Sequence, residues 1–290
     1  MWTTAVFLQE QLTVPPRGKP DFLLNTKRLF RAPGSPHTRA DPFLVAFHDR
    51  LYCFYETQVA DDFGRIEVSE LTDTGVTAGE PVLSEPFHLS FPGILQDGET
   101  IYMLPETQGA DEMRLYRFTD FPRGLVFHRR LSDGRFADPA AVRVKGVWYV
   151  FGTTSRGLEL FFTEDIGSGP LRAHPASPIT MDPRYRRCGG APFFAGDRLL
   201  RPAQDGANGY GKNINLMTIE TISPTEYHET LYEQDIFTRL GDWNSLGGHH
   251  LSIAPHRGGM AVAIDGQSND YYIHKVVTRL WMLATNRKRR

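Results

Sequence analysis

"SFPGILQDGETIYMLPETQ", residues 90–108, repeats a pattern that the chain also shows at residues 40–58, "ADPFLVAFHDRLYCFYETQ". Both stretches run from a proline through a short apolar strand and a polar turn into a second strand that ends in Glu-Thr-Gln. Short runs of β-branched and aromatic residues bounded by turn residues are typical of antiparallel β-hairpins. The repeat therefore predicts that two strand-end carboxylates, Glu56 and Glu106, occupy equivalent places in the fold.

Three more copies of the hairpin follow along the chain: "FADPAAVRVKGVWYVFGTTS", "GGAPFFAGDRLLRPAQDG" and "GHHLSIAPHRGGMAVAIDGQ". Pro42, Pro92, Pro139 and Pro192 are separated by 50, 47 and 53 residues, and the fifth unit begins at His249 and His250 without a proline. A period of this length suits four antiparallel strands per unit, which is the size of a propeller blade.

The repeats predict an all-β fold, a single five-bladed β-propeller over residues 1–290 with a narrow central channel. A third strand follows each hairpin: "GRIEVSEL", "MRLYRF", "LELFFTED", "NINLMTI" and "YYIHKVVTRL". No stretch longer than about ten residues shows helical apolar spacing. We expect blades to start near 40, 88, 136, 189 and 248, residues 1–39 to close the ring, and residues 284–290 to form a basic tail.

Composition excludes several classes of protein. The 290 residues include 40% hydrophobic and 23% charged residues with a net charge of -2, which is typical of a soluble globular protein without a strong field for nucleic acid. The chain shows neither a secretory signal nor an apolar stretch of membrane-spanning length. We therefore expect a cytoplasmic protein, with Cys53 in a buried strand and Cys188 in a loop, both reduced.

Propeller geometry predicts that equivalent residues of all blades converge at one end of the channel. Two rings of candidates follow, and the sequence leaves open which of them is nearer the mouth. The strand-end ring is Glu56, Glu106, Thr153 or Thr154, Asp205 and Asp265, and the blade-start ring is Asp41, His88 with Ser90, Asp138, Gly189 with Gly190, and His249 with His250. Acids at strand ends also cap turns, as Asp265 before Gly266 would.

The Ala-Asp-Pro openings of the first and third blades resemble those of glycoside hydrolase family 43 and its relatives in family 32. That resemblance implies a base or nucleophile role for Asp41 and an acid-tuning role for Asp138. A closer resemblance is to the propeller domain of plant glucosamine inositolphosphorylceramide transferases and bacterial relatives. It is carried over about residues 40–270 by "ADPFL", "HLSFP", "MLPET", "RPAQD" followed by "YG", and "GGHH".

One departure from family 43 concerns the general acid. The family places a glutamate just before the Ala-Pro of the fourth blade, where this chain has Gly190. Glycoside hydrolysis needs an acid and a second carboxylate across the bond, and the acid must stay protonated near neutral pH. Glu106, or alternatively Glu56, is predicted to supply it, because crowded buried carboxylates raise one another's pKa.

Other candidates are predicted to bind the ligand: His88, Arg201, Asp205, His249, His250 and Asp265. Arg201 offers a planar fork of donors for a carboxylate or phosphate, or alternatively a salt bridge to Asp205 or another channel acid. His249 and His250 alternate faces on a strand, so one should point inward. His250 is a candidate ligand for a channel-bound divalent ion, although no other cofactor is expected.

Three functions are compatible with these residues. The first is a glycoside-hydrolase-like enzyme that cleaves or transfers a glycosyl unit. The second is a propeller that binds a sugar or sugar phosphate without turnover beside an enzyme of glycan or glycolipid biosynthesis, which would explain Gly190. The third is an enzyme of another class acting on a small polar metabolite, since one fold hosts many chemistries.

Overall fold

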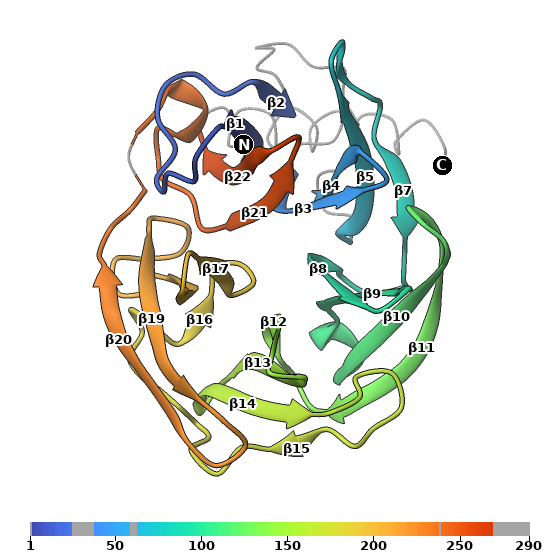
Figure 1. Cartoon of the computed structure of the whole chain (residues 1–290), viewed down its shortest axis with the longest axis vertical. Helices are drawn as coiled ribbons and strands as arrows, with labels where there is room; N and C mark the ends of the chain where they lie inside the picture. Colours follow the sequence, from blue (N-terminus) through green and yellow to red (C-terminus); the bar gives the residue numbers. More distant parts are fainter. Residues whose placement is uncertain (1, 25–37, 59–62, 238, 269–290) are drawn as a thin grey trace, which may run out of the picture.

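The computed structural model describes residues 2–24, 38–58, 63–237 and 239–268. Within these ranges the chain forms strands and two short 3-10 helices, η1 (Gln108–Ala110) and η2 (Asp242–Asn244), and no helix long and apolar enough to cross a membrane. Five sheets stand around one axis like blades (Figure 1). The predicted all-β, five-bladed propeller is confirmed.

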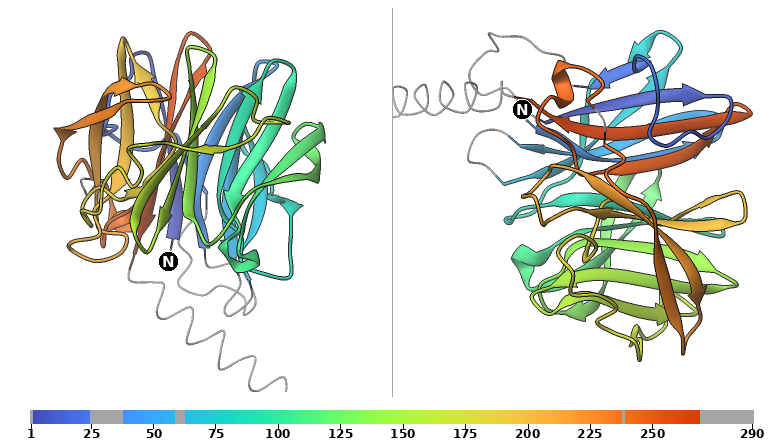
Figure 2. Two further views of the ribbon diagram at one scale, coloured as in Figure 1. Left: turned by 90° about the horizontal axis from the view of Figure 1, so that it is seen from below. Right: turned by 90° about the vertical axis from the view of Figure 1, so that its left-hand side faces the viewer.

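Each blade is an antiparallel sheet whose first strand faces the axis (Figures 1 and 2). The first blade comprises β3 (Thr38–Phe47), β4 (Arg50–Gln58), β5 (Arg65–Thr72), β6 (Gly75–Val76) and β7 (Glu80–Leu83). The second comprises β8 (Ser90–Asp97), β9 (Thr100–Glu106), β10 (Glu112–Asp120) and β11 (Arg123–Asp133). The third comprises β12 (Ala137–Val144), β13 (Val147–Thr154), β14 (Gly157–Thr163) and β15 (Arg172–Ala173).

The fourth blade comprises β16 (Arg187–Cys188), β17 (Phe193–Ala195), β18 (Arg198–Gln204), β19 (Ile214–Ile222) and β20 (Tyr227–Glu233). Cys188, expected in a loop, ends β16, and it is free and buried like Cys53.

The fifth blade joins both parts of the chain. Its order from the axis is β21 (Leu251–His256), β22 (Gly259–Gln267), β1 (Trp2–Gln9) and β2 (Phe22–Leu24). β1 pairs with β22 along its whole length, from Trp2 opposite Gln267 to Gln9 opposite Met260. The third strand predicted at 271–280 and the basic tail at 284–290 lie outside the described residues, and β1 holds the place next to β22.

A β-bulge interrupts the inner hairpin of the first three blades at the residue before its proline. The register shifts between Ala40 and Phe43, between Ser90 and Gly93, and between Ala137 and Ala140. The bulged residues Asp41, Phe91 and Asp138 have φ angles of 51°, 49° and 46°. Non-glycine residues rarely adopt this left-handed conformation, and such bulges re-aim a side chain. Here they direct two of the predicted site carboxylates.

The interior is apolar between neighbouring blades and becomes aromatic at the axis. Phe43 of β3 and Phe91 of β8 pack edge to face with ring centroids 5.1 Å apart, and the His250 ring lies 4.7 Å and 4.9 Å from them. All three side chains are at most 4% exposed. These aromatic side chains pack next to the polar residues that gather at one end of the propeller axis, which are described next.

Candidate functional site

The two predicted rings meet at the same end of the propeller. In an antiparallel hairpin the start of the first strand lies beside the end of the second. Glu56 accordingly faces Ala40 next to Asp41, and Glu106 faces Ser90. The question of which ring is nearer the mouth therefore has a simple answer, because both form one level of the structure.

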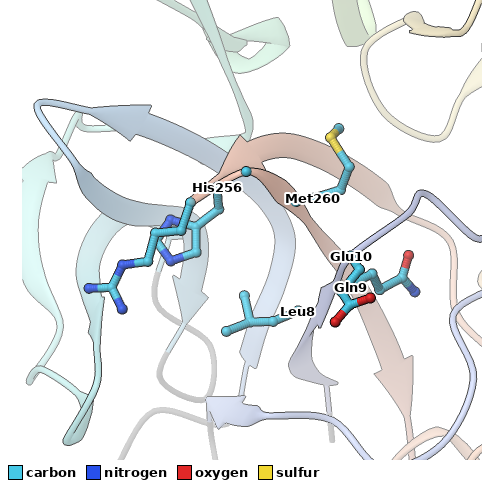
Figure 3. Close-up of a pocket in the computed structure, with 8 residues that line it drawn as sticks. Leu8, Gln9, Glu10, His256 and Met260 are labelled. Atoms are coloured by element: carbon cyan, nitrogen blue, oxygen red, sulfur yellow. The ribbon is translucent and has the colours of Figure 1, made fainter.

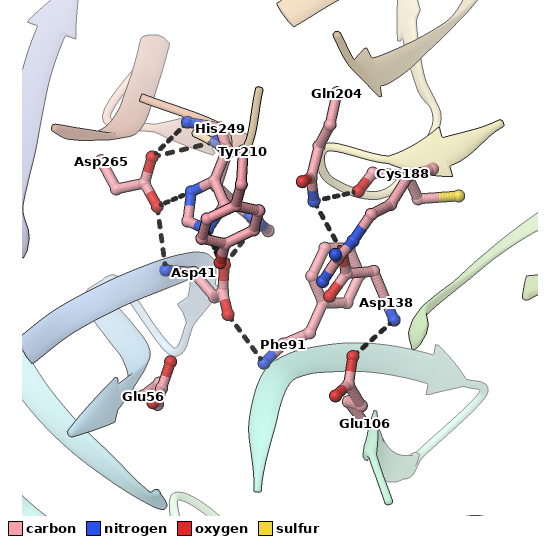
Figure 4. A network of polar contacts seen from close by, with 12 residues as sticks. Asp41, Glu56, Phe91, Glu106, Asp138, Cys188, Gln204, Tyr210, His249 and Asp265 are labelled. Carbon is pink, nitrogen blue, oxygen red and sulfur yellow. Dashed lines mark hydrogen bonds and ion pairs between the residues drawn. The ribbon is translucent and has the colours of Figure 1, made fainter. Parts of the chain in front are cut away.

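A cluster of buried polar side chains gathers at this level, and it consists of Asp41, Glu56, Glu106, Asp138, His249 and Asp265 (Figure 4). Asp41 belongs to the half of the cluster that the first and fifth blades supply. Its Oδ2 accepts a hydrogen bond from the Phe91 backbone N–H at 3.2 Å, and its own N–H donates to Asp265 Oδ2 at 3.3 Å. Asp265 Oδ1 accepts the backbone N–H groups of His249 and His250 at 2.8 Å and 3.0 Å. Asp265 thus fixes the start of the fifth blade against the first.

His249 connects this half to a tyrosine. Its Nδ1 lies 2.6 Å from Asp265 Oδ2, and its Nε2 lies 3.7 Å from Asp41 Oδ1 and 2.6 Å from the Tyr210 hydroxyl. The Trp2 ring stacks on the imidazole at 4.2 Å. The N-terminal strand therefore contributes directly to the site.

Glu106 and Asp138 form the other half. The Asp138 N–H donates to Glu106 Oε2 at 2.9 Å, and the Gln108 side-chain amide donates to Glu106 Oε1 at 2.6 Å. Asp138 Oδ2 accepts hydrogen bonds from Arg187 Nε and from Gln204 Nε2. A buried aspartate with two side-chain donors is held ionised, whereas no cation among the described residues makes a hydrogen bond to its neighbour Glu106.

Burial and crowding favour the protonated form of three of these acids. Burial raises the pKa of Glu106 to about 8, with the charge of Asp138 adding to the effect. Burial likewise raises the pKa of Asp41 to about 7, although His249 opposes the rise. The pKa of Glu56 is also raised, by burial and then by Asp41. These three groups can hold protons near neutral pH.

Two other acids and one histidine are held in their charged forms. Burial opposes ionisation of Asp138, but the Arg187 guanidinium brings its pKa below the ordinary range. Burial acts on Asp265 in the same way, and His249 outweighs it, so that the Asp265 pKa is lowered. The pKa of His249 is raised despite burial, because Asp265 and Asp41 lie beside it.

His250 occupies a different environment from His249. Neither of its ring nitrogens makes a hydrogen bond of normal geometry within the described part of the chain, and burial lowers its pKa to about 3. The three atoms that converge within 4.8 Å as possible metal ligands come from Asp41, His249 and Asp265, not from His250. Of these, His249 and Asp265 already contact each other, so an ion would have to displace that contact.

Arg201 does not reach the cluster. Its side chain is fully buried inside the fourth blade, where it donates to both carboxylate oxygens of Glu229 at 2.6 Å and 2.8 Å and to the Tyr185 carbonyl. The salt-bridge alternative is therefore correct, but its partner is Glu229 on β20 rather than Asp205 or a channel acid. A role for Arg201 in ligand binding stays a prediction.

Asp205 and His88 lie at the edges of the site. The Asp205 carboxylate accepts hydrogen bonds from Ala207 N and Asn208 Nδ2 and so caps its own loop. His88 Nε2 lies 3.6 Å from Glu56 Oε1, and its Nδ1 accepts the Gly64 N–H.

Sequence reasoning missed several residues that contact the cluster, among them Arg187, Gln204 and Tyr210. Neighbouring strand residues alternate sides, and Gln204 rather than Asp205 points toward Asp138. Tyr210 belongs to the Gly-rich loop predicted near the channel mouth, but a repeat search cannot find a residue that occurs in one blade alone. Arg187 lies just before the fourth repeat, outside the repeated pattern, so the same search cannot find it.

A cavity of about 230 Å³ opens beside the cluster, lined among others by Thr153, Arg186, Arg187, Gln204 and Tyr210. A second hollow, of about 310 Å³, lies near the turn of β21 and β22, at the far end of these strands (Figure 3). Its lining, with Leu8, His256 and Met260, brings together no pair of carboxylates. The cavity beside Arg187 is therefore the better candidate for ligand entry.

Gly190, at the family 43 acid position, cannot carry a side chain in this structure. Its φ is +140°, and a Cβ built there would lie 2.0 Å from the Leu251 carbonyl oxygen of the fifth blade. The fourth and fifth blades pass too close for any other residue at this position.

Comparisons with known proteins place this arrangement among relatives. A family model described as "Glucosamine inositolphosphorylceramide transferase 1, N-terminal" matches residues 28–267. Glucosamine inositolphosphorylceramide transferase 1 of Oryza sativa subsp. japonica is 32% identical over 244 residues, covering 78% of this chain and 33% of that protein. The protein of the same name from Arabidopsis thaliana is 30% identical over 266 residues, covering 84% and 34%. The chain spans about a third of the length of these relatives.

Solved structures support the fold. A β-1,2-mannobiose phosphorylase from Listeria innocua superposes with a TM-score of 0.61 at 11% identity, covering 94% of this chain and 99% of that one. An α-L-arabinofuranosidase from Clostridium thermocellum gives 0.56 at 14% identity, covering 77% and 80%. At these identities the likeness concerns architecture alone.

Proposed function

The chain belongs to the family of the N-terminal domain of glucosamine inositolphosphorylceramide transferase 1, and from this premise we propose that it is a carbohydrate-active propeller that cleaves or transfers a glycosyl unit. One observation carries the proposal. Two buried carboxyl groups, those of Glu106 and Asp138, lie side by side with a 2.9 Å hydrogen bond from Asp138 N to Glu106 Oε2, and Arg187 pairs with Asp138, so that their pKa values are displaced in opposite directions. Environments that separate the pKa values of neighbouring acids are how glycosidases assign acid and base roles.

The chemistry needs a proton donor and a carboxylate that accepts a proton. In this proposal Glu106 gives its proton to the glycosidic oxygen. At the same time the bond between that oxygen and the anomeric carbon breaks, and the electron pair of this bond stays on the oxygen. Asp41, whose pKa of about 7 leaves its ionised form populated at neutral pH, removes in that form a proton from the water or acceptor hydroxyl that bonds to the anomeric carbon. Asp138 stays charged and keeps Glu106 protonated.

A second candidate, sugar or sugar-phosphate binding without turnover, is favoured by Gly190. The geometry at this position excludes the acid that family 43 uses, so catalysis would need Glu106, or alternatively Glu56, as the acid. Association with an enzyme of glycan or glycolipid biosynthesis would give a binding domain its role, and the relatives are named as transferases. That partner and a cytoplasmic location stay predictions.

One set of variants distinguishes these candidates. Wild type, Asp41→Asn, Glu106→Gln and Glu99→Gln are assayed for release of the aglycone from a panel of aryl glycosides and for thermal stabilisation by sugars and sugar phosphates. Glu99 is the matched control, since it is exposed at the far turn of the same hairpin. An enzyme loses at least about 100-fold in rate in the first two variants and little in the third.

Two other outcomes are informative: one supports the binding candidate, and the other rejects both candidates. Stabilisation by a sugar with no release in any protein supports the binding candidate and rejects catalysis. No stabilisation and no release across the panel would overturn both.

A further inference from the structure

The acids of the cluster are closed off from the adjoining cavity. Asp41, Glu56, Glu106 and Asp138 are 4%, 8%, 3% and 2% exposed. None of them is among the residues that line the 230 Å³ cavity, although Arg187 and Gln204 reach both sides. A wall therefore separates any ligand in the cavity from the groups proposed to act on it.

Tyr210 forms that wall in front of Asp41. Its hydroxyl is bonded to His249 Nε2 at 2.6 Å, and the same nitrogen lies 3.7 Å from Asp41 Oδ1. The residue as a whole is 55% exposed and lines the cavity. Tyr210 thus extends from solvent to the cluster, and Figure 4 shows it next to His249.

Few contacts hold the tyrosine in this place. Its ring stands edge to face on the His249 imidazole at 4.9 Å and 89°, and the Arg187 guanidinium lies over it at 5.3 Å. Its hydroxyl makes one hydrogen bond. The Trp2 ring also stands edge to face on the tyrosine at 6.0 Å and 68°. Within the described residues, the side chain is therefore held by a single polar contact and by the side chains of Trp2, His249 and Arg187.

The loop that carries Tyr210 has the features of a hinge. Asp205 N donates to Asn213 O at 2.9 Å, which closes the base of the loop. Within the loop Gly209 and Gly211 have φ angles of +102° and +73°, a region that glycine enters without strain. Backbone rotation at these glycines would swing the tyrosine away while the strands on either side keep their pairing.

We propose that Tyr210 is the gate of the carboxylate site, latched by its hydroxyl on His249, and that a ligand in the cavity reaches Asp41 only when this loop opens. The inference deepens the proposed function, because it concerns access to the same site. The latch would also reconcile the near-complete burial of these acids with the role that the proposed function gives them.

Chemical modification of histidine tests the gate without a ligand. His249 and His250 are adjacent and both buried, but only His249 contacts Tyr210. Diethyl pyrocarbonate is allowed to react with wild type, Tyr210→Phe, Tyr210→Ala and Tyr232→Phe, and the modification rate of each histidine is followed by mass spectrometry. Tyr232→Phe is the matched control, because Tyr232 is a half-exposed tyrosine whose hydroxyl accepts a hydrogen bond from Arg198 and does not contact His249.

The phenylalanine variant is decisive because it keeps the covering ring and removes only the latch. Loss of one hydrogen bond should make opening more frequent, so that His249 reacts roughly three to ten times faster than in wild type. The alanine variant should react faster still, and His250 should stay unmodified in all four proteins. A pH series from 6 to 8 separates a changed His249 pKa from changed access.

Two results would overturn the gate. If His249 in Tyr210→Phe reacts at the wild-type rate, the ring is a fixed wall. If His249 and His250 react together, exposure comes from unfolding of the blade. Neither result bears on glycoside turnover, so failure of the gate and failure of the proposed function are separately visible.

Discussion

Gly190 shows what a single residue decides in this propeller. Its α-carbon passes the fifth blade so closely that the nearest atom to an added Cβ would be a backbone oxygen, which cannot rotate away as a flexible side chain can. The position that family resemblance marks for catalysis thus serves contact between blades. Restoring a glutamate there would disturb that contact before it supplied a proton.

We predict that Gly190→Ala destabilises the protein by more than about 3 kcal/mol, because backbone strain and a clash act together. Gly196→Ala is the control, since Gly196 also has a positive φ, +62°, but nothing within 4 Å of the added Cβ. It should lose only about 1–2 kcal/mol. Urea unfolding measures both, and equal losses would show that the approach to Leu251 is unimportant.

Some site residues can be predicted from sequence, and others cannot, for a physical reason. Glu56, Glu106, Asp41 and Asp138 occupy repeated positions, and the geometry of a hairpin brings repeated positions together. Tyr210 lies in a loop found in one blade, and its contact with His249 depends on how that loop folds back. No periodicity encodes such a contact.

At the scale of the element, the fourth blade carries a buried ion pair that replaces apolar packing. Arg201 is 0% exposed, and its partner Glu229 also accepts the Tyr227 hydroxyl at 2.6 Å. The sequence indicates an arginine on this strand but not the side on which it lies. Its partner comes from β20, the outer strand of the same sheet, which explains why a channel partner was the wrong expectation.

We predict that Arg201→Met costs about 3–5 kcal/mol, because it leaves Glu229 buried without a counter-charge. Adding Glu229→Leu should recover at least half of that loss, since an apolar pair of similar size needs no desolvated charge. Chemical denaturation of the two single variants and the double variant gives the coupling energy. Additive losses would mean that the pair is not the unit that stabilises this blade.

The bulges explain why strand prediction succeeds while side-chain direction does not. A two-residue alternation predicts which residues face the core, but each bulge inserts one residue and changes the phase. Asp41 and Asp138 sit at those insertions. The direction of these two side chains depends on the positive φ of each aspartate, which precedes a proline. Neither composition nor periodicity indicates such a φ, so only the structure shows it.

On the scale of the whole molecule, the cluster couples folding to pH. Asp41, Glu56, Glu106 and His249 all have folded-state pKa values above their ordinary ones, with Asp41 at about 7 and Glu106 at about 8. Between the ordinary pKa values of these carboxyl groups, 3.8 and 4.5, and their folded values of about 7 and about 8, the folded state therefore holds more protons than the unfolded state. Stability falls as pH rises through this range. Asp138 and Asp265 have lowered pKa values, so their contribution is lost in acid instead.

We predict a melting temperature that is highest near pH 5 and declines toward pH 8 and above. Glu106→Gln mimics the protonated side chain and should make that decline shallower, raising the melting temperature at pH 8 by about 2–4 °C. Differential scanning calorimetry across pH 4 to 9 checks both statements. A melting temperature that rises from pH 5 to pH 8 would contradict the assignment of protons to the cluster.

The pairing of Trp2 with Gln267 closes the ring of blades by strand pairing between β1 and β22. The ring therefore has no structural beginning or end, and the numbering of the blades follows only the order of the chain. Antiparallel partners lie about 5 Å apart, so a short linker could join residues 2 and 267. A circular permutant could then be opened at the turn between β19 and β20, where residues 224–226 are exposed, with the pairing of the described strands unchanged. The acids would come from the same hairpins in a rotated order, so the site depends on the cyclic succession of blades and not on where that succession is cut.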